Sequence, residues 1–150
     1  MMTQKLLKAV SMFLFIVIYG TFLFADSHGI IKYRQNVMKS VSGHMGAIVD
    51  ILKNRLPLKD HIVAHALSMQ QISRMTLSMF PDGSGKGRTK SKKVIWGKWS
   101  EFESAASDFE RESSKLAEVA QLGDKEALAK QVRATGKTCS GCHKNFRKRN

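Results

Sequence analysis

Apolar side chains recur at steps of three and four along most of the chain after residue 30, which is the pattern of helices packed on one side. The first stripe covers 31–52, and the Leu-Pro-Leu at 56–58 ends it because the residue before a proline avoids helical geometry. Asp26 or Ser27 is expected to cap this helix. A second stripe covers 59–79, with Thr76 on its inner face, and stops at Phe-Pro-Asp-Gly.

The second half of the chain repeats the pattern. A third helix is expected to start between Trp96 and Ser100 and to end at Gly123, and a fourth to begin at Asp124. One face of the fourth helix carries Leu128, Val132, Thr135, Cys139, Cys142 and Phe146. The polar, glycine-rich stretch 83–93 has no apolar period and reads as a loop. Alternating Val/Ile/Thr runs are few, so strand signals are weak. Short links favour antiparallel neighbours. The sequence therefore predicts an all-α, up-down-up-down four-helix bundle.

The pattern of the first 25 residues indicates a targeting segment. Lys5 and Lys8 precede an uncharged, mostly apolar run that extends from residue 9 to residue 24, and polarity begins at Asp26. This is the layout of a secretory signal peptide cleaved near Ala25, although Leu23 makes the cleavage motif imperfect. An uncleaved N-terminal anchor is the alternative, with a run that is short for a spanning helix. We expect residues 1–25 to be the signal peptide, 26–150 to be one folded domain, and no stable membrane insertion after cleavage.

Charge limits the classes of partner. The chain has 25 Lys and Arg against 12 Asp and Glu, a formal net charge of +13. Basic residues gather in 86–93 and in the Arg-Lys-Arg of 147–149. Because export is expected, nucleic acid is not an expected partner. A solvated basic surface, an acidic redox partner or an anionic lipid remain as interpretations.

The pentapeptide Cys139-Ser140-Gly141-Cys142-His143 is C-x-x-C-H, the attachment signature of c-type haem. Thiols three residues apart can form thioethers with two haem vinyl groups, and the adjoining His143 then places an imidazole over the iron. A thioredoxin-like site needs a βαβ context, a zinc site needs a second ligand pair, and a disulfide would strain a continuous helix. One covalent haem c near the C-terminus is therefore expected.

Two residues of the first stripe bear on that haem. Arg34 occupies a core position, where an unpaired guanidinium is costly, so with Gln35 it is a candidate for binding a haem propionate. An Arg34 that snorkels outward is the alternative. Met38 lies one turn further along the same face, and with Arg34 at a propionate it would point toward the iron from the side opposite His143. From its spacing alone, an ordinary core methionine is the favoured interpretation of Met38.

Other candidate motifs are weaker. His61 and His65 lie four residues apart on the second helix, and we interpret them as solvated histidines rather than as metal ligands. Residues 83–89 resemble a phosphate loop only superficially, because no strand precedes them and the full motif is missing. We see no general base, nucleophile or second metal site, so an enzyme is not expected.

The whole segment 26–150 resembles cytochrome c′, the class II c-type cytochromes. The resemblance rests on Lys-Tyr-Arg-Gln at 32–35, on His44 ten residues after Arg34, and on Phe80-Pro81. It rests further on Thr89 with Ile95-Trp96, on Ala-Thr-Gly-Lys-Thr at 134–138 before the haem motif, and on Phe146-Arg147 after it.

The resemblance implies a bundle that is often a homodimer through its first two helices. It implies His143 as fifth iron ligand, Arg34 and Gln35 beside the propionates, Thr89 at the haem edge and Arg147 next to the proximal imidazole. Met38 falls where the family places its distal pocket residue. One departure is the basic 86–93 loop, in which lysine replaces the usual Pro-Glu before Ile-Trp.

The expected function is that of a periplasmic haem protein whose five-coordinate, high-spin iron binds small diatomic gases such as nitric oxide, in an apolar distal pocket, or carries electrons. The alternative is a low-spin electron-transfer cytochrome with Met38 as sixth iron ligand.

Overall fold

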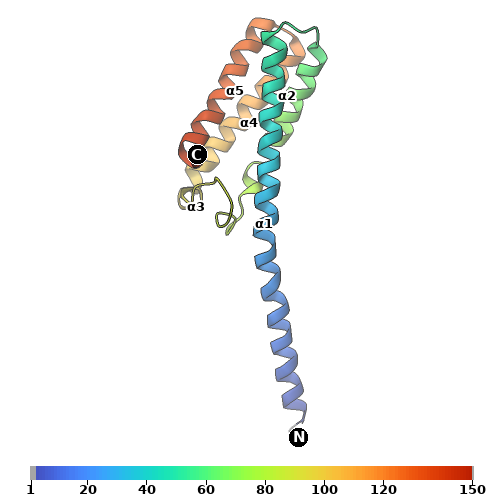
Figure 1. Cartoon of the computed structure of the whole chain (residues 1–150), viewed down its shortest axis with the longest axis vertical. Helices are drawn as coiled ribbons and strands as arrows, with labels where there is room; N and C mark the ends of the chain where they lie inside the picture. The colour runs from blue at the N-terminus through green and yellow to red at the C-terminus, as the bar shows by residue number, and fades with distance from the viewer. Residues whose placement is uncertain (1–2, 150) are drawn as a thin grey trace.

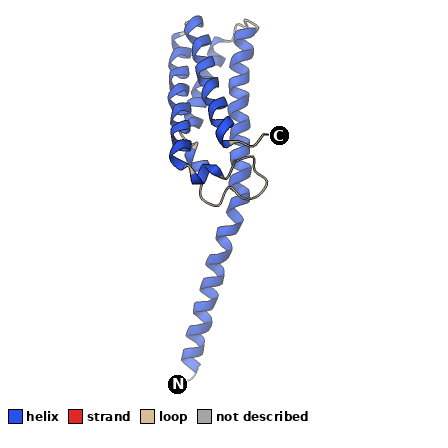
Figure 2. Ribbon diagram, turned by 90° about the vertical axis from the view of Figure 1, so that its left-hand side faces the viewer, coloured by secondary structure: helices blue, strands red, loops and turns tan. Residues whose placement is uncertain are grey.

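The computed structural model describes the backbone of residues 3–149 and the side chains of residues 28–149. Its regular elements are helices: α1 (Thr3–Lys53), α2 (Lys59–Ser73), the 3-10 helix η1 (Leu77–Met79), α3 (Val94–Gly97), α4 (Trp99–Leu122) and α5 (Lys125–Phe146). The four long helices α1, α2, α4 and α5 form an antiparallel bundle, from one end of which α1 projects (Figure 1). The loop after η1 and the short α3 lie at that same end (Figure 2). The predicted fold class is confirmed.

The first helix begins far earlier than expected. Its backbone is one helix from Thr3 to Lys53, so the prediction that Asp26 or Ser27 caps its start is wrong. No proline interrupts this part of the chain, and nothing forces the helix to break where polarity begins. The predicted signal peptide lies outside the residues whose side chains are described. Among the described residues, no helix has the length and apolar character needed to span a bilayer.

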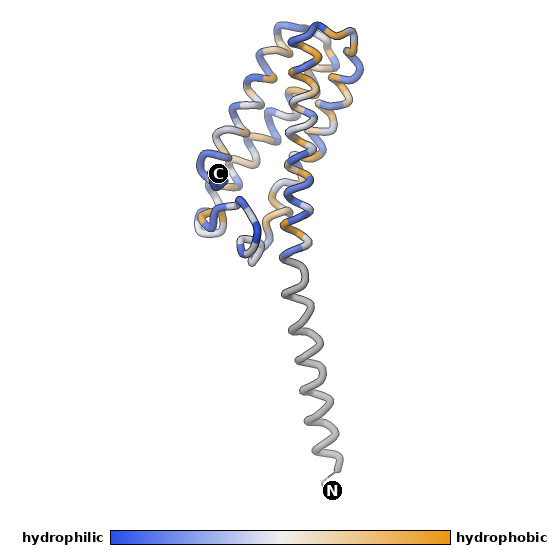
Figure 3. Tube along the Cα trace, in the orientation of Figure 1, coloured by the Kyte–Doolittle hydropathy of each residue, from blue (hydrophilic) through white to orange (hydrophobic). Residues whose placement is uncertain are grey.

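Two apolar clusters form the core. The larger one joins the predicted stripes of all four long helices: Val41, Ile48, Ile51, Ile62, Ala66, Met69, Phe109, Leu116, Ala117, Ala120 and Leu128. The smaller one contains Met79, Phe80, Ile95, Phe102 and Phe146. Hydrophobic and hydrophilic residues accordingly alternate around each bundle helix (Figure 3). Full burial of one large side chain such as Leu116 contributes about 1.5–3 kcal/mol.

The helix ends follow local chemistry except at the end of α2. Gly123 adopts φ 76°, a left-handed conformation that closes α4. The Asp124 carboxylate accepts hydrogen bonds from the backbone N–H groups of Glu126 and Ala127 and caps α5. The second helix, however, ends at Ser73 rather than at Met79, and a turn followed by η1 completes the segment. The apolar period continues through that turn, which is why the sequence pattern does not reveal it.

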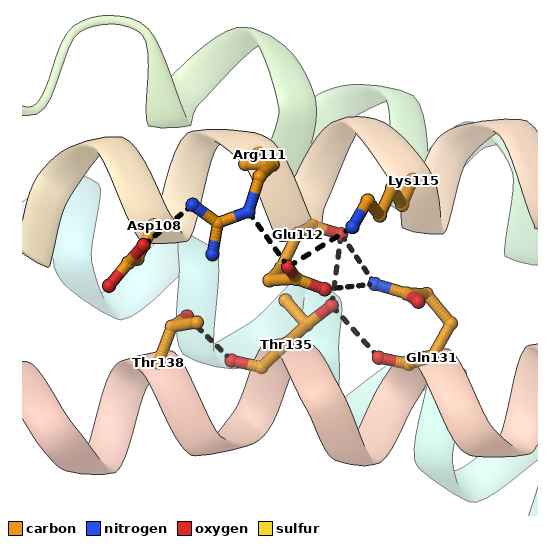
Figure 4. Close-up of polar contacts among 7 residues, drawn as sticks. All are labelled: Asp108, Arg111, Glu112, Lys115, Gln131, Thr135 and Thr138. Atoms are coloured by element: carbon orange, nitrogen blue, oxygen red, sulfur yellow. Dashed lines mark hydrogen bonds and ion pairs between the residues drawn. The ribbon is translucent and has the colours of Figure 1, made fainter.

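A polar contact joins α4 to α5 inside the bundle (Figure 4). The Gln131 amide donates to the Glu112 carbonyl and carboxylate at 3.0 and 2.9 Å, and the fully buried Thr135 hydroxyl lies 3.2 Å from the same carbonyl. The Gln131 hydrogen bond is the main cause that holds the pKa of Glu112 below its usual value. The pair of hydrogen bonds from Gln131 to Glu112 fixes α4 and α5 in one register.

A histidine pair joins α1 to α2. The Nδ1 atoms of His44 and His65 lie 2.9 Å apart, and both rings are half-buried. Burial first, and then the proximity of His65, lower the pKa of His44, which favours the neutral form. The interpretation of His65 as a solvated histidine is therefore wrong, because α1 supplies a partner that sequence spacing on α2 does not reveal. His61 is exposed, as expected.

Candidate haem site

A cavity of about 540 Å³ opens at the end of the bundle that carries the smaller apolar cluster. Residues from α1, the α2–η1 segment, the 89–91 loop, α4 and α5 form its wall. The helices α1 and α5 contact each other at few points, whereas α5 packs closely along α4. The cavity therefore occupies space that these two helices leave between them. It takes in most of the residues that the sequence singled out.

Helix α5 supplies one wall, with Cys142, His143, Phe146 and Arg147. Cys139, one turn earlier, is not among the lining residues and packs instead against the larger apolar cluster. Both cysteines are free thiols and half-buried. Each is on the inner side of α5 because the helix buries Leu128, Thr135 and Phe146 on that face. The motif is therefore placed between the core and the cavity.

Burial sets the protonation of this wall. It raises the pKa of Cys142 to about 11, with a smaller contribution from Cys139, and it raises the pKa of Cys139 as well. Desolvation, followed by the positive charge of Arg147, lowers the pKa of His143. His143 is therefore held in the neutral form, which is the form of imidazole that binds metal ions.

Arg34 is buried, with 3% of its surface exposed, so the outward-snorkelling alternative is wrong. One terminal nitrogen donates to the Met79 carbonyl and the Ser84 hydroxyl at 3.0 and 3.1 Å. The other donates to the Ser84 carbonyl and the Thr89 hydroxyl, each at 3.0 Å. The guanidinium also lies over the Phe80 ring, 4.5 Å from its centroid. Neutral oxygens of η1 and of the loop after it satisfy four of its five donors, a network that the sequence did not predict.

Arg34 still lines the cavity, and its remaining Nε–H makes no hydrogen bond within the described chain. Burial lowers its pKa, although a guanidinium stays charged in proteins. A positive group with a spare donor at the cavity wall suits a carboxylate. The contact between Arg34 and a propionate stays a prediction.

Gln35 and Thr89 hold the loop rather than fill the cavity. The Gln35 amide is exposed and donates to the Arg88 carbonyl at 2.8 Å. The Thr89 hydroxyl, besides binding Arg34, accepts from the Ser91 backbone N–H at 3.1 Å. Both residues still lie at the cavity wall, as expected of groups near a haem edge.

The loop and the C-terminal segment close the site together. Ser91 and Arg147 form an isolated antiparallel bridge. The Lys148 N–H donates to the Lys90 carbonyl at 2.7 Å, and the Lys92 N–H donates to the Phe146 carbonyl at 2.9 Å. Sequence analysis missed this pairing, because one bridge between segments 56 residues apart leaves no alternating strand pattern.

Met38 faces the cavity from α1 and packs against the smaller apolar cluster. Three aromatic rings complete the wall: Phe80, Phe102 and Phe146. Phe102 meets the other two edge to face, with centroids 4.7 and 5.3 Å away. In the sequence Phe102, Phe109 and Leu116 follow one another at intervals of seven residues, a helical spacing that predicts burial but no contact with a cofactor. Thr76 also lines the cavity, and its role was not anticipated.

The described residues fit a covalently held haem. The volume lies within the roughly 300–1,000 Å³ of small-molecule and cofactor sites, and the wall is largely apolar and aromatic. A thiol and a neutral imidazole occur together on one side, and a guanidinium is available for carboxylates.

Comparison with known proteins agrees with this geometry. The family profile described as Cytochrome C' matches residues 29–147. The cytochrome c' of Pararhodospirillum photometricum is 34% identical over 82% of this chain and 99% of its own length. Cytochrome c prime from Shewanella frigidimarina has the same fold, with a TM-score of 0.77 and 27% identity over 82% of this chain and 97% of that one. A variant of the Alcaligenes xylosoxidans protein, 24% identical over 83% of this chain and 97% of that one, was solved as a nitric oxide complex with a TM-score of 0.76.

A four-helix bundle with C-x-x-C-H on its last helix, beside a cavity of this kind, defines the class of bundle-type c haem proteins. Within that class, the chain belongs to the cytochrome c′ family. It accordingly carries haem c, covalently attached through Cys139 and Cys142.

Proposed function

We propose that this protein binds small diatomic gases such as nitric oxide at a five-coordinate, high-spin haem, with His143 as the axial ligand. The observation that carries the proposal is the placement of Met38 on α1 and of His143 on α5, on different walls of one cavity. When bound, haem iron offers one open coordination position and can also exchange one electron. The nitric oxide complex of the Alcaligenes xylosoxidans protein supports the same role.

The residues around the cavity have different proposed roles. His143, kept neutral by burial and by Arg147, holds the iron from the α5 side. Arg34 and Gln35 stand at the edge suited to propionates, with Thr89 beside them. Met38 limits the space on the other side, so that small uncharged molecules enter and larger ligands do not. The proposed role is binding or electron transfer rather than an enzymatic reaction.

Location and assembly are part of the proposal. The apolar segment up to Ala25 supports export to the periplasm as a signal peptide. Most exposed large apolar side chains of the described part lie on α1, on α2 or in the turns after them: Tyr33, Val49, Leu56, Leu67 and Met75. Exposed apolar side chains on these two helices and in the turns after them support a homodimer through α1 and α2. A structural neighbour with a TM-score of 0.79 is described as having ligand-controlled dimer dissociation.

Met38→Ala provides the test of the gas-binding role. The wild-type ferrous protein should show a five-coordinate high-spin spectrum and bind nitric oxide. The variant should bind it faster, because removal of the side chain enlarges the space opposite His143, and its resting spectrum should not change. Optical spectra and stopped-flow mixing with nitric oxide provide the measurement.

Met45→Ala is the matched control, since Met45 follows Met38 by seven residues on α1 but packs against the larger cluster. It should lower stability without changing ligand entry. A resting low-spin spectrum that becomes high-spin in Met38→Ala would make Met38 the sixth ligand, and the electron-carrier function would replace the gas-binding one.

Electron exchange with an acidic protein is the second proposed function, and the charge around the cavity favours it. The bridge between Ser91 and Arg147 joins two positively charged segments. Residues 83–100 contain six Lys or Arg, residues 127–150 contain seven, and neither segment contains Asp or Glu. A partner with an acidic face would therefore dock beside the haem edge.

Raising the ionic strength from about 0.01 to 0.15 M shortens the Debye length from about 30 to 8 Å. Electron transfer with an acidic redox protein should therefore slow by at least tenfold over this range. Electron transfer with an uncharged small reductant is the control. A rate of electron transfer with the acidic protein that does not change with ionic strength would contradict docking at this basic surface.

A further inference from the structure

The Thr76 hydroxyl is a buried polar group without a partner in the haem cavity. Thr76 has 6% of its surface exposed, lines the cavity, and its Oγ1 makes no hydrogen bond. Among the residues with described side chains, one other buried hydroxyl has no partner, that of Ser113, which lies on α4 and does not line the cavity. Thr135 illustrates the usual case, because its buried hydroxyl lies within hydrogen-bond distance of two carbonyls.

Folded proteins rarely leave a buried hydroxyl unpaired, because the hydrogen bonds to water that it loses on burial are then not replaced. The position of Thr76 is fixed: its N–H donates to the Ser73 carbonyl at 3.1 Å, and its carbonyl accepts from the Met79 N–H at 3.3 Å. The bond from Arg34 to the Met79 carbonyl holds this turn against α1. Only the hydroxyl rotor is free, so it can be aimed at a group that enters the cavity.

We propose that the Thr76 hydroxyl donates a hydrogen bond to the outer atom of a diatomic ligand bound in the cavity. This inference rests on the proposed gas-binding function and adds a residue that selects among gases. Thr76 and Met38 come from the α1 and α2 side of the cavity, whereas His143 comes from α5. A ligand opposite His143 would therefore lie between them.

The selected class is that of diatomics whose outer atom becomes negative when the inner atom binds ferrous iron. Oxygen has this property most strongly, nitric oxide less and carbon monoxide least. The expected distal pocket is therefore not wholly apolar, because it contains one oriented donor among apolar side chains.

Carbon monoxide and nitric oxide are the probes, used on the ferrous holoprotein. Thr76→Val keeps the shape and removes the donor. We expect the infrared C–O stretch to rise, because a hydrogen bond at oxygen weakens the C–O bond. Nitric oxide should dissociate roughly three- to tenfold faster, the factor that corresponds to one ordinary hydrogen bond.

Thr76→Ser keeps the hydroxyl and should retain the wild-type frequency and dissociation rate. Ser113→Ala removes the unpaired hydroxyl that lies outside the cavity, and neither quantity should change. If Thr76→Val is too unstable to purify, Thr76→Ala replaces it in the same measurements.

The outcomes separate this inference from the proposed function. If the wild type and Thr76→Val both bind carbon monoxide with the same stretch and release nitric oxide at the same rate, the inference is wrong and gas binding stands. A change confined to the reduction potential would assign the hydroxyl to a propionate and would also overturn it. If the wild type binds neither gas, the proposed function fails and the inference fails with it.

Discussion

Replacing both Cys139 and Cys142 with serine should abolish covalent haem attachment completely, because a hydroxyl forms no thioether. All haem should then be lost on acid-acetone extraction, and the denatured polypeptide should give no haem stain on a gel. Either single substitution should keep one thioether and a weaker stain. The fold should largely persist, since both cysteines are only half-buried and serine is close in size.

Ser140→Ala is the control for this experiment, because Ser140 lies inside the same pentapeptide but is exposed and donates only to backbone carbonyls of its own helix. It should retain the full haem stain. Covalent haem in the double serine variant would show that the attachment does not use this motif.

Arg34→Leu should lower the free energy of unfolding by about 3 kcal/mol, because it removes four hydrogen bonds and leaves buried loop oxygens unpaired. The Ser84 hydroxyl and carbonyl lose both of their bonds to the guanidinium. Amide exchange should therefore accelerate across residues 79–91. The reduction potential should shift as well if a propionate loses its counter-charge. Urea unfolding, hydrogen exchange and redox titration of the holoprotein provide the measurements.

Gln35→Ala is the matched control, since Gln35 is adjacent, exposed and makes one bond to the loop. Its effect on stability should be below about 1 kcal/mol. The loss of stability in Arg34→Lys should lie between those of Arg34→Leu and Gln35→Ala, because an ammonium keeps the charge but not the planar set of donors. Unchanged stability in Arg34→Leu would contradict the loop-anchoring role, and an unchanged potential would contradict the propionate contact.

The sequence was sufficient where structure depends on neighbours along the chain. Stripes with steps of three and four predicted the bundle, Gly123 and Asp124 predicted two helix ends, and C-x-x-C-H predicted a covalently attached haem c. Each of these signals acts over one or two helical turns.

It was insufficient where two distant segments meet. The oxygens that satisfy Arg34 come from residues 45 to 55 positions away, and the partner of His65 lies 21 positions away. The early start of α1 and the end of α2 at Ser73 were missed for another reason: the composition of both regions is compatible with helix, and tertiary packing decides.

The polar contact between α4 and α5 determines the position of the haem motif along the bundle axis. Gln131 and Thr135 precede Cys139 by two turns and one turn on α5, and both bind Glu112. A slip of α5 by a single turn would carry both thiols and the imidazole about 5.4 Å along α4, away from the aromatic wall. Because protein atoms alone make this contact, it should set the same register of α5 against α4 in the apoprotein, before haem is attached. Gln131 and Thr135, two turns and one turn before Cys139, should therefore preorganise the motif for haem attachment.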